Sequence, residues 1–244
     1  MNRLTIDIGN SSVKIAVFNN RELIHHQRFD ELGVAELERL INDYSIDKSI
    51  ISSVNQEVEV LENILKAHTL YTRFSALLTN GVTNMYKTPH SLGLDRWAGI
   101  LGAKGCFPSY ACLVIDAGTC ITYDLLQSDS TYSGGSISPG IEMRFKAVHE
   151  FTKRLPLVDW NAEEEIVAGT DTQSAIRNGV LQGMINEIEG FIAINNKKES
   201  ALKVIITGGD ANFLYKQLQN SIFAPQIVKD AFIVLKGLNE AIAD

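Results

Sequence analysis

One short pattern occurs twice in the chain, each time where an apolar strand ends. Residues 4–9 read LTIDIG and residues 113–118 read LVIDAG, and a small polar residue follows each copy, Asn10 or Thr119. A glycine after a strand lets the backbone turn tightly, so that consecutive N–H groups can face an anion. A neighbouring carboxylate can hold the cation that neutralises this anion. The pattern therefore predicts two phosphate-binding turns.

The surroundings of the two turns also match each other. A second strand follows each turn, at 13–18 and 121–126, and a third strand is expected at 23–28 and 131–138. A single Asp-x-Gly is usually a plain β-turn, but two copies at equivalent places indicate a duplicated plan. We predict domains at 1–110 and 111–244, with a polyphosphate clamped between the two turns.

The remaining periodicity predicts alternating helices and strands. Further strands are expected at 49–54 and 203–207, and helices at 33–43, 58–66, 94–106, 140–152, 172–195, 211–219 and 230–243. Gly208-Gly209 follows the strand at 203–207 as a third close-approach turn, and Asp210 is the expected N-cap of the next helix. The fold class is α/β, with a mixed sheet flanked by helices in each half.

Composition limits the classes of function. The chain of 244 residues has 22 Lys and Arg against 29 Asp and Glu, a net charge of −7. We therefore expect no nucleic-acid or membrane partner, because such binding needs concentrated positive charge. The three cysteines are odd in number and lack metal-ligand spacing, which predicts free thiols. No signal peptide is recognised, so a cytoplasmic location is expected.

The stretch at 86–96, YKTPHSLGLDR, offers groups for an acceptor alcohol. Gly93 precedes the predicted helix, and Asp95 lies in its first turn, where a carboxylate is favoured by the helix dipole alone. Asp95 is thus either a helix-dipole residue or a group that orients an acceptor hydroxyl. Arg96 can pair with a substrate anion or with a nearby carboxylate. Neither a Walker A sequence nor a protein-kinase motif set is present.

Taken together, these motifs resemble a known family. The paired turns resemble the duplicated actin-like (ribonuclease H-like) domains of actin, sugar kinases and heat-shock ATPases, with the active site in the interdomain cleft. The PxxLGxDR motif at 89–96 is similar to the substrate signature of type III pantothenate kinases. DIGNS at 7–11, DAGTC at 116–120, GGSISPG at 134–140 and TGGDA at 207–211 continue this resemblance in order.

The resemblance implies a function and a set of roles. The expected reaction is ATP-dependent phosphorylation of pantothenate to 4'-phosphopantothenate, the first step of coenzyme A biosynthesis, by a homodimer. The implied ATP site consists of Asp7, Ile8, Gly9, Asn10, Ser11, Ser12, Val13, Lys14 and Thr119. The implied pantothenate site consists of Tyr86, Gly93, Leu94, Asp95, Arg96 and Thr172. Asp95 would be the general base, Asp7 would lie near Mg²⁺, and Asp116 would bind K⁺ or NH₄⁺.

Two other functions stay open on the sequence. One is a kinase of the same superfamily acting on another small alcohol or acid. The other is a regulatory, transcription-accessory protein that kept the fold and lost the chemistry. Retention of Asp7, Asp95, Asp116 and Thr119 argues against lost chemistry.

Overall fold

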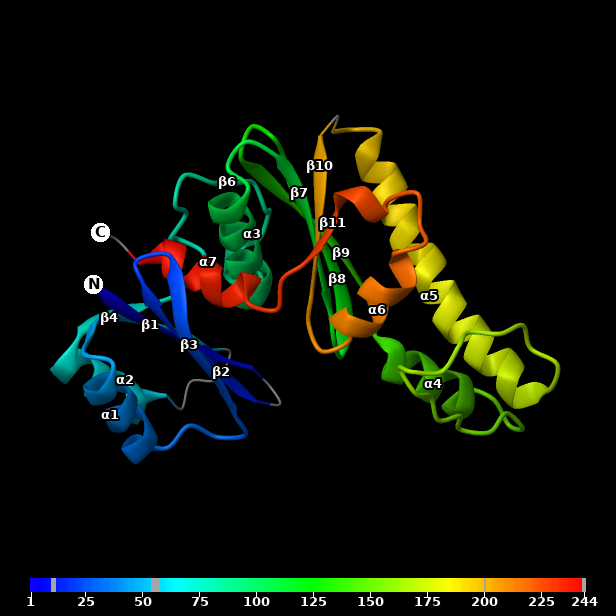
Figure 1. Ribbon diagram of the computed structural model, residues 1–244, viewed down its shortest axis with the longest axis horizontal. Helices are drawn as coiled ribbons and strands as arrows, with labels where there is room; N and C mark the ends of the chain where they lie inside the picture. Colours follow the sequence, from blue (N-terminus) through cyan, green and yellow to red (C-terminus); the bar gives the residue numbers. More distant parts are fainter. Residues whose placement is uncertain (10–11, 54–57, 200, 243–244) are drawn as a thin grey trace. The chain divides into compact units, whose positions relative to one another are not determined.

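The structure, a computed structural model, describes residues 1–9, 12–53, 58–199 and 201–242 in two compact units (Figure 1). The first unit comprises Met1–Ser109, Ser130–Ser133 and Phe232–Asp244, and the second comprises Tyr110–Asp129 and Gly134–Ala231. These units differ from the predicted domains because the last helix belongs to the first unit. The expected domain duplication stays a prediction.

The first unit contains a five-stranded sheet in the order β3-β2-β1-β4-β5. Its strands are β1 (Asn2–Ile8), β2 (Val13–Asn19), β3 (Glu22–Phe29), β4 (Ile46–Ser53) and β5 (Leu70–Arg73). The predicted meander is confirmed, since β1, β2 and β3 are antiparallel neighbours. β4 and β5 continue the sheet in parallel, β4 beside β1. Both faces of the sheet are covered at β1, because Leu4 and Thr5 point to opposite faces and are both fully buried.

Four α-helices belong to the first unit: α1 (Val34–Asp43), α2 (Glu59–His68), α3 (Leu94–Cys106) and α7 (Ile233–Ala241). Helices α1 and α2 lie side by side against one face of the sheet, and α7 packs on the other face (Figure 1). The helical spacing of Leu37, Leu40 and Ile41 makes the apolar face of α1 that enters the core. The unit also contains η1 (Pro89–Ser91) and the short strand β6 (Thr83–Asn84), which pairs with Thr131 and Tyr132.

Close backbone contact attaches α7 to α3. A Cβ placed on Gly237 would lie 1.7 Å from the Ala98 carbonyl oxygen, and one on Gly102 would lie 2.1 Å from the Ile233 carbonyl oxygen. Real Cβ atoms do not approach oxygens so closely, so only glycine permits this crossing. Helix α7 therefore lies in the first unit, whereas the predicted domain at 111–244 includes it, since a contact between residues 98 and 237 leaves no local pattern in the sequence.

The second unit is a sheet with three helices. The strand order of this sheet is β11-β10-β7-β8-β9-β6, and β6 and the first residues of β9 are counted with the first unit. The strands are β7 (Ala111–Ala117), β8 (Cys120–Leu126), β9 (Thr131–Pro139), β10 (Leu202–Thr207) and β11 (Ile227–Lys229). Strands β7 and β8 form an antiparallel pair, and β10 is parallel to β7. The helices are α4 (Ile141–Glu150), α5 (Thr172–Asn196) and α6 (Ala211–Leu218), with the short helix η2 (Ala224–Gln226) before β11.

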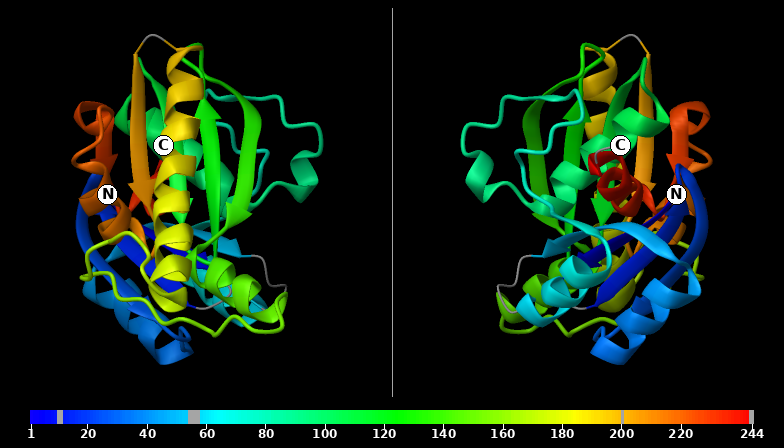
Figure 2. Two further views of the ribbon diagram at one scale, coloured as in Figure 1. Left: turned by 90° about the vertical axis from the view of Figure 1, so that its right-hand side faces the viewer. Right: turned by 90° about the vertical axis from the view of Figure 1, so that its left-hand side faces the viewer.

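Helix α5 is the longest element and runs along the second sheet (Figure 2). It begins with a capping box in which the Asp171 carboxylate accepts from the Gln173 and Ser174 N–H groups. Its buried stripe packs into a core with β7, β8 and β10. This stripe consists of Val180, Leu181, Met184, Ile185, Ile188 and Ile192.

The sequence-based elements and the structure differ mainly at short edge elements. Strands β5, β6 and β11 were not predicted, because runs of two to four residues carry little periodicity. Asp210 occupies the N-cap position of α6 as expected, but its side chain makes no capping hydrogen bond, so this part of the prediction is wrong. The predicted α/β class with two mixed sheets is confirmed. The predicted strand end at Val54 and helix end at Ala243 lie outside the described residues.

We expect Gly237→Ala to lower the free energy of unfolding by about 2–3 kcal/mol, because the new methyl group must displace the α3 backbone. Thermal or urea unfolding measures this loss. Gly190→Ala on α5 is the matched control, since its Cβ would meet nothing within 4 Å. That change should stabilise the protein by up to about 1 kcal/mol through helix propensity. Equal effects of the two substitutions would contradict the close-contact explanation.

Candidate functional site

The first predicted phosphate turn connects β1 and β2. Asp7 pairs with Lys14, and Ile8 with Val13, in the antiparallel register. The Gly9 N–H donates to the Ser12 carbonyl oxygen at 3.1 Å, which closes the turn. Asp7 is half-buried, whereas Gly9 and Lys14 are exposed. The structure therefore brings together the described part of the predicted phosphate loop, while Asn10 and Ser11 lie outside the described residues.

Asp95, which is predicted to orient the acceptor hydroxyl, lies at the start of α3. Its side chain is exposed, and its Oδ1 accepts from the Arg96 N–H at 2.8 Å. The preceding Gly93 is the N-cap, and a Cβ there would come within 2.6 Å of Asp95 Oδ1. A glycine at 93 thus leaves room for this orientation of the carboxylate, which is accessible to a small alcohol.

Arg96 has a different environment from its neighbour. Its side chain is only 8% exposed, and its guanidinium carbon lies 5.7 Å from the centre of the Tyr86 ring. The Tyr86 ring stacks on the Tyr132 ring, with ring centres 6.2 Å apart. The Trp97 ring also packs against Tyr132, with ring centres 5.7 Å apart. The structure therefore joins two predicted acceptor residues, Tyr86 and Arg96, through an aromatic cluster that the sequence did not reveal.

The second predicted phosphate turn connects β7 and β8. The Gly118 N–H donates to the Cys120 carbonyl oxygen at 3.0 Å, and Thr119 at the tip is exposed. Asp116 at the end of β7 is half-buried. Carboxylate and carbonyl oxygens are suitable ligands for hard cations, so this turn fits a cation as well as a phosphate.

Two glycines press against this second turn. A Cβ on Gly140 would lie 2.1 Å from the Gly118 carbonyl oxygen, and a Cβ on Gly208 would lie 2.4 Å from Asp116 Oδ1. Gly208 also has a positive φ of 96°, which favours glycine. The Gly208-Gly209 turn, predicted as a third close-approach turn, therefore does approach the second turn.

Asp210 follows the Gly208 turn and has an unusual titration. Its N–H donates to the Ala117 carbonyl oxygen at 3.0 Å. Burial raises the pKa of its carboxyl group, and the negative charge of Glu142 raises the pKa further. The sequence predicted Asp210 only as a helix cap, because neither its burial nor the nearby Glu142 can be recognised from its neighbours along the chain.

Thr172 is the first residue of α5 and is exposed, in the second unit. The other predicted pantothenate residues, at 86 and 93–96, lie in the first unit. One turn after Thr172, a mainly apolar groove of about 450 Å³ opens between α4 and α5. Pro139, Met143, Arg144 and Ile176 contribute to its lining.

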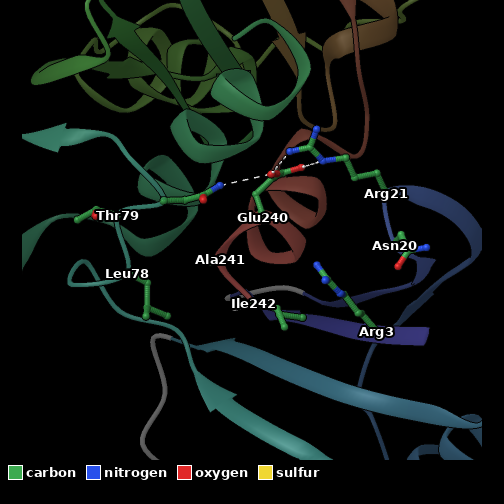
Figure 3. Close-up of a pocket in the computed structure, with 9 residues that line it drawn as sticks. Arg3, Asn20, Arg21, Leu78, Thr79, Glu240, Ala241 and Ile242 are labelled. Carbon is green, nitrogen blue, oxygen red and sulfur yellow. Dashed lines mark hydrogen bonds and ion pairs between the residues drawn. The ribbon is translucent and has the colours of Figure 1, made fainter. Parts of the chain in front are cut away.

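A cavity of about 560 Å³ in the first unit lies away from the predicted turn (Figure 3). It is lined by the beginning of β1 and by α7, whereas Asp7 is at the other end of β1. Glu240 pairs there with Arg21 at 2.9 Å and accepts from Asn80 at 3.3 Å. None of the predicted site residues lines this cavity.

The described residues contain no group of three or more His, Cys, Asp or Glu side chains arranged to hold a metal ion. Cys106, Cys112 and Cys120 are thiols, as predicted. Within the described part of the chain, no helix is long and apolar enough to cross a bilayer.

Solved structures define the class of fold. A candidate Baf family transcriptional activator from Campylobacter jejuni matches with a TM-score of 0.62 at 23% identity, covering 98% of this chain and 96% of that one. A candidate N-acetylmannosamine kinase from Listeria monocytogenes matches with a TM-score of 0.53 at 15% identity, covering 99% and 97%. At these identities the likeness shows the fold alone, which is that of the actin-like sugar kinases and ATPases.

Sequence comparison identifies the family within this class. The model of the type III pantothenate kinase family matches residues 3–194. A type III pantothenate kinase of Christiangramia forsetii is 42% identical over 97% of this chain and 96% of the relative. One of Phocaeicola vulgatus is 40% identical, over 98% and 97%. The chain belongs to the type III pantothenate kinase family.

The raised pKa of Asp210 predicts a pH-dependent stability. Folding disfavours the charged carboxylate, so the stability present below the ordinary pKa of 3.8 falls as the pH rises through the folded value. Asp210→Asn removes this loss, and the variant should melt at a higher temperature than the unmodified protein at neutral pH. The difference should disappear below pH 3.8. A variant less stable at neutral pH would contradict the assigned cause.

Proposed function

We propose that this protein is a kinase that transfers the γ-phosphoryl group of ATP to pantothenate, giving 4'-phosphopantothenate for coenzyme A synthesis. The observation that carries this proposal is the membership of the type III pantothenate kinase family over nearly the whole chain. Asp95 is exposed beside the Tyr86–Arg96 pair, and its carboxylate is accessible to the hydroxyl group that would accept the phosphoryl group.

Asp95 is the proposed catalytic residue. In a loose phosphoryl-transfer transition state, the acceptor proton leaves late, so the carboxylate acts mainly by aligning the primary hydroxyl of pantothenate. The hydrogen bond from the Arg96 N–H fixes one carboxylate oxygen and hence the direction of the other. Tyr86, Gly93, Leu94, Arg96 and Thr172 are the proposed pantothenate contacts, and the cationic Arg96 suits the carboxylate of this substrate.

The two glycine turns are the proposed ATP contacts. The first contributes the residues from Asp7 to Lys14, and the second contributes Thr119. Asp7 is the proposed neighbour of Mg²⁺, and Asp116 is the proposed ligand of K⁺ or NH₄⁺, since both cations prefer oxygen donors. When bound, these cations neutralise phosphate charge. The protein's own part is to direct backbone N–H groups and the Thr119 hydroxyl at the nucleotide.

A homodimer in the cytoplasm is the proposed state of the enzyme. Apolar side chains on and beside α4 are exposed, including Ile137 at 62%, Met143 at 43% and Phe151 at 89%. Large exposed apolar side chains are common at protein interfaces. A second copy covering Met143 would also cover part of the groove that begins one turn after Thr172, because Met143 contributes to its lining.

A coupled assay of ADP release tests the proposed reaction. Release should require pantothenate together with ATP and Mg²⁺, and it should increase on adding K⁺ at constant ionic strength. The reason for the K⁺ effect is that the Asp116 carboxylate is negatively charged, as the phosphates are, and a K⁺ ion held by it would neutralise part of this combined charge. Simple sugars, acetate and other small alcohols serve as control acceptors. ADP release that is equal with a control acceptor, or independent of any acceptor, would contradict the proposal.

Asp95→Asn should lower kcat/KM for pantothenate by about 10²–10⁴-fold, because the uncharged amide aligns the hydroxyl less firmly and cannot take up its proton when it leaves. The affinity for ATP, measured by titration in the absence of pantothenate, should stay within about twofold because Asp95 contacts the acceptor only. Steady-state kinetics of the purified variant gives the first quantity. Turnover equal to that of the unmodified enzyme would remove Asp95 from the mechanism.

A further inference from the structure

A cluster of four polar side chains in the second unit connects α5 to the segment that precedes α4. Glu187 of α5 accepts at Oε1 from the Tyr123 hydroxyl at 2.8 Å and from the Ser138 hydroxyl at 2.6 Å. Its Oε2 accepts from Arg144 Nη2 at 2.7 Å. Both carboxylate oxygens are therefore used, by donors that come from β8, β9 and α4.

The cluster is charged although it is largely shielded from water. The side chains of Arg144 and Glu187 are 19% and 28% exposed. Burial works to raise the pKa of Glu187, but hydrogen bonds from Ser138, Arg144 and Tyr123 outweigh burial and hold the pKa below its ordinary value. Burial and the adjacent Glu187 raise the pKa of Tyr123, so this hydroxyl stays a donor. A partly buried ion pair of this kind is weak evidence for stability alone, because its desolvation opposes its attraction.

Arg144 extends the cluster toward the second glycine turn. Its Nη2 also donates to the Ser138 hydroxyl at 2.5 Å, and its Nε donates to the Pro139 carbonyl oxygen at 2.8 Å. The next residue, Gly140, donates its N–H to the Thr119 carbonyl oxygen at 3.1 Å. A continuous series of contacts therefore leads from Glu187 through Arg144 and the 138–140 segment to Thr119.

We propose that Glu187 and Arg144 are positioning residues for Thr119, which they hold in its nucleotide-binding orientation by fixing the 138–140 segment against the turn. This inference rests on the proposed function, in which Thr119 contacts ATP. The planar guanidinium fork suits this task because its N–H groups have fixed directions, two of them toward consecutive residues of the segment. The position of the 138–140 segment determines the position of the turn, because the Gly140 backbone contacts the turn directly, with no side chain between them.

The test is Glu187→Gln, which keeps the shape of the side chain and removes its charge. Its affinity for a non-hydrolysable ATP analogue with Mg²⁺ should fall about tenfold, because a small displacement of a positioned contact has a large effect. The KM for ATP should rise about as much, while the KM for pantothenate should change by less than about twofold. Nucleotide titration and steady-state kinetics provide these values, and circular dichroism checks the fold.

Glu163→Gln is the matched control. It removes an ion pair of the same unit, Glu163 with Lys216 at 3.0 Å, in which both side chains are mostly exposed. This control should leave the nucleotide affinity unchanged. If Glu187→Gln does not fold, Arg144→Lys replaces it, because lysine keeps the charge and loses the fork. Arg144→Lys should then show the same selective loss of nucleotide affinity.

Two results would overturn the inference. One is unchanged nucleotide affinity in a folded Glu187→Gln or Arg144→Lys variant. The other is a rise confined to the KM for pantothenate, which would place the cluster in acceptor binding, since Arg144 also lines the groove between α4 and α5. Failure of the unmodified protein to phosphorylate pantothenate would refute the proposed function instead, and the nucleotide titration would still decide the role of Glu187.

Discussion

Contact between backbone atoms at Gly140 and Gly208 is the interaction on which the second turn depends. The two glycines approach it from different elements, Gly140 before α4 and Gly208 after β10. Any side chain at either position would overlap the turn and push it outward. A phosphate turn needs its N–H groups held in fixed directions, since a flexible turn loses entropy each time it binds an anion. In the proposed ATP site, the two glycines supply this rigidity without filling the space that the phosphate would require.

A similar contact organises the first unit. Glycines at 102 and 237 let α3 and α7 cross with their backbones nearly touching. Asp95 and Arg96 are in the first turn of α3, so the helix that carries the proposed acceptor groups is held by the C-terminal part of the chain. This explains why the compact units do not follow the order of the sequence. The C-terminal helix α7 belongs to the first unit because it packs along α3.

The sequence was sufficient for features that depend on local pattern. Strand–glycine turns, the long amphipathic α5 and the helix at 94–106 follow from periodicity and from glycine chemistry, and the residues of each predicted turn that the structure describes lie together. Apart from the short strands β5, β6 and β11, the unpredicted features depend on contacts between distant residues. Glu187 and Ser138 are 49 positions apart and Tyr123 and Glu187 are 64 apart, so no local pattern indicates their cluster. The raised pKa of Asp210 likewise depends on burial and on Glu142, not on its neighbours in sequence.

Fold similarity alone does not distinguish a kinase from a regulatory protein that shares its architecture, because one protein described as a candidate transcriptional activator also matches. The distinction comes from adjacent residues on α3. Successive helical residues point about 100° apart, and here Asp95 is exposed while Arg96 is buried beneath Tyr86. The helix dipole alone favours a carboxylate at position 95, but it does not account for a buried guanidinium held against an aromatic ring at position 96. In the proposed mechanism the carboxylate aligns a hydroxyl and the guanidinium holds an anionic acceptor, so this pair favours catalysis.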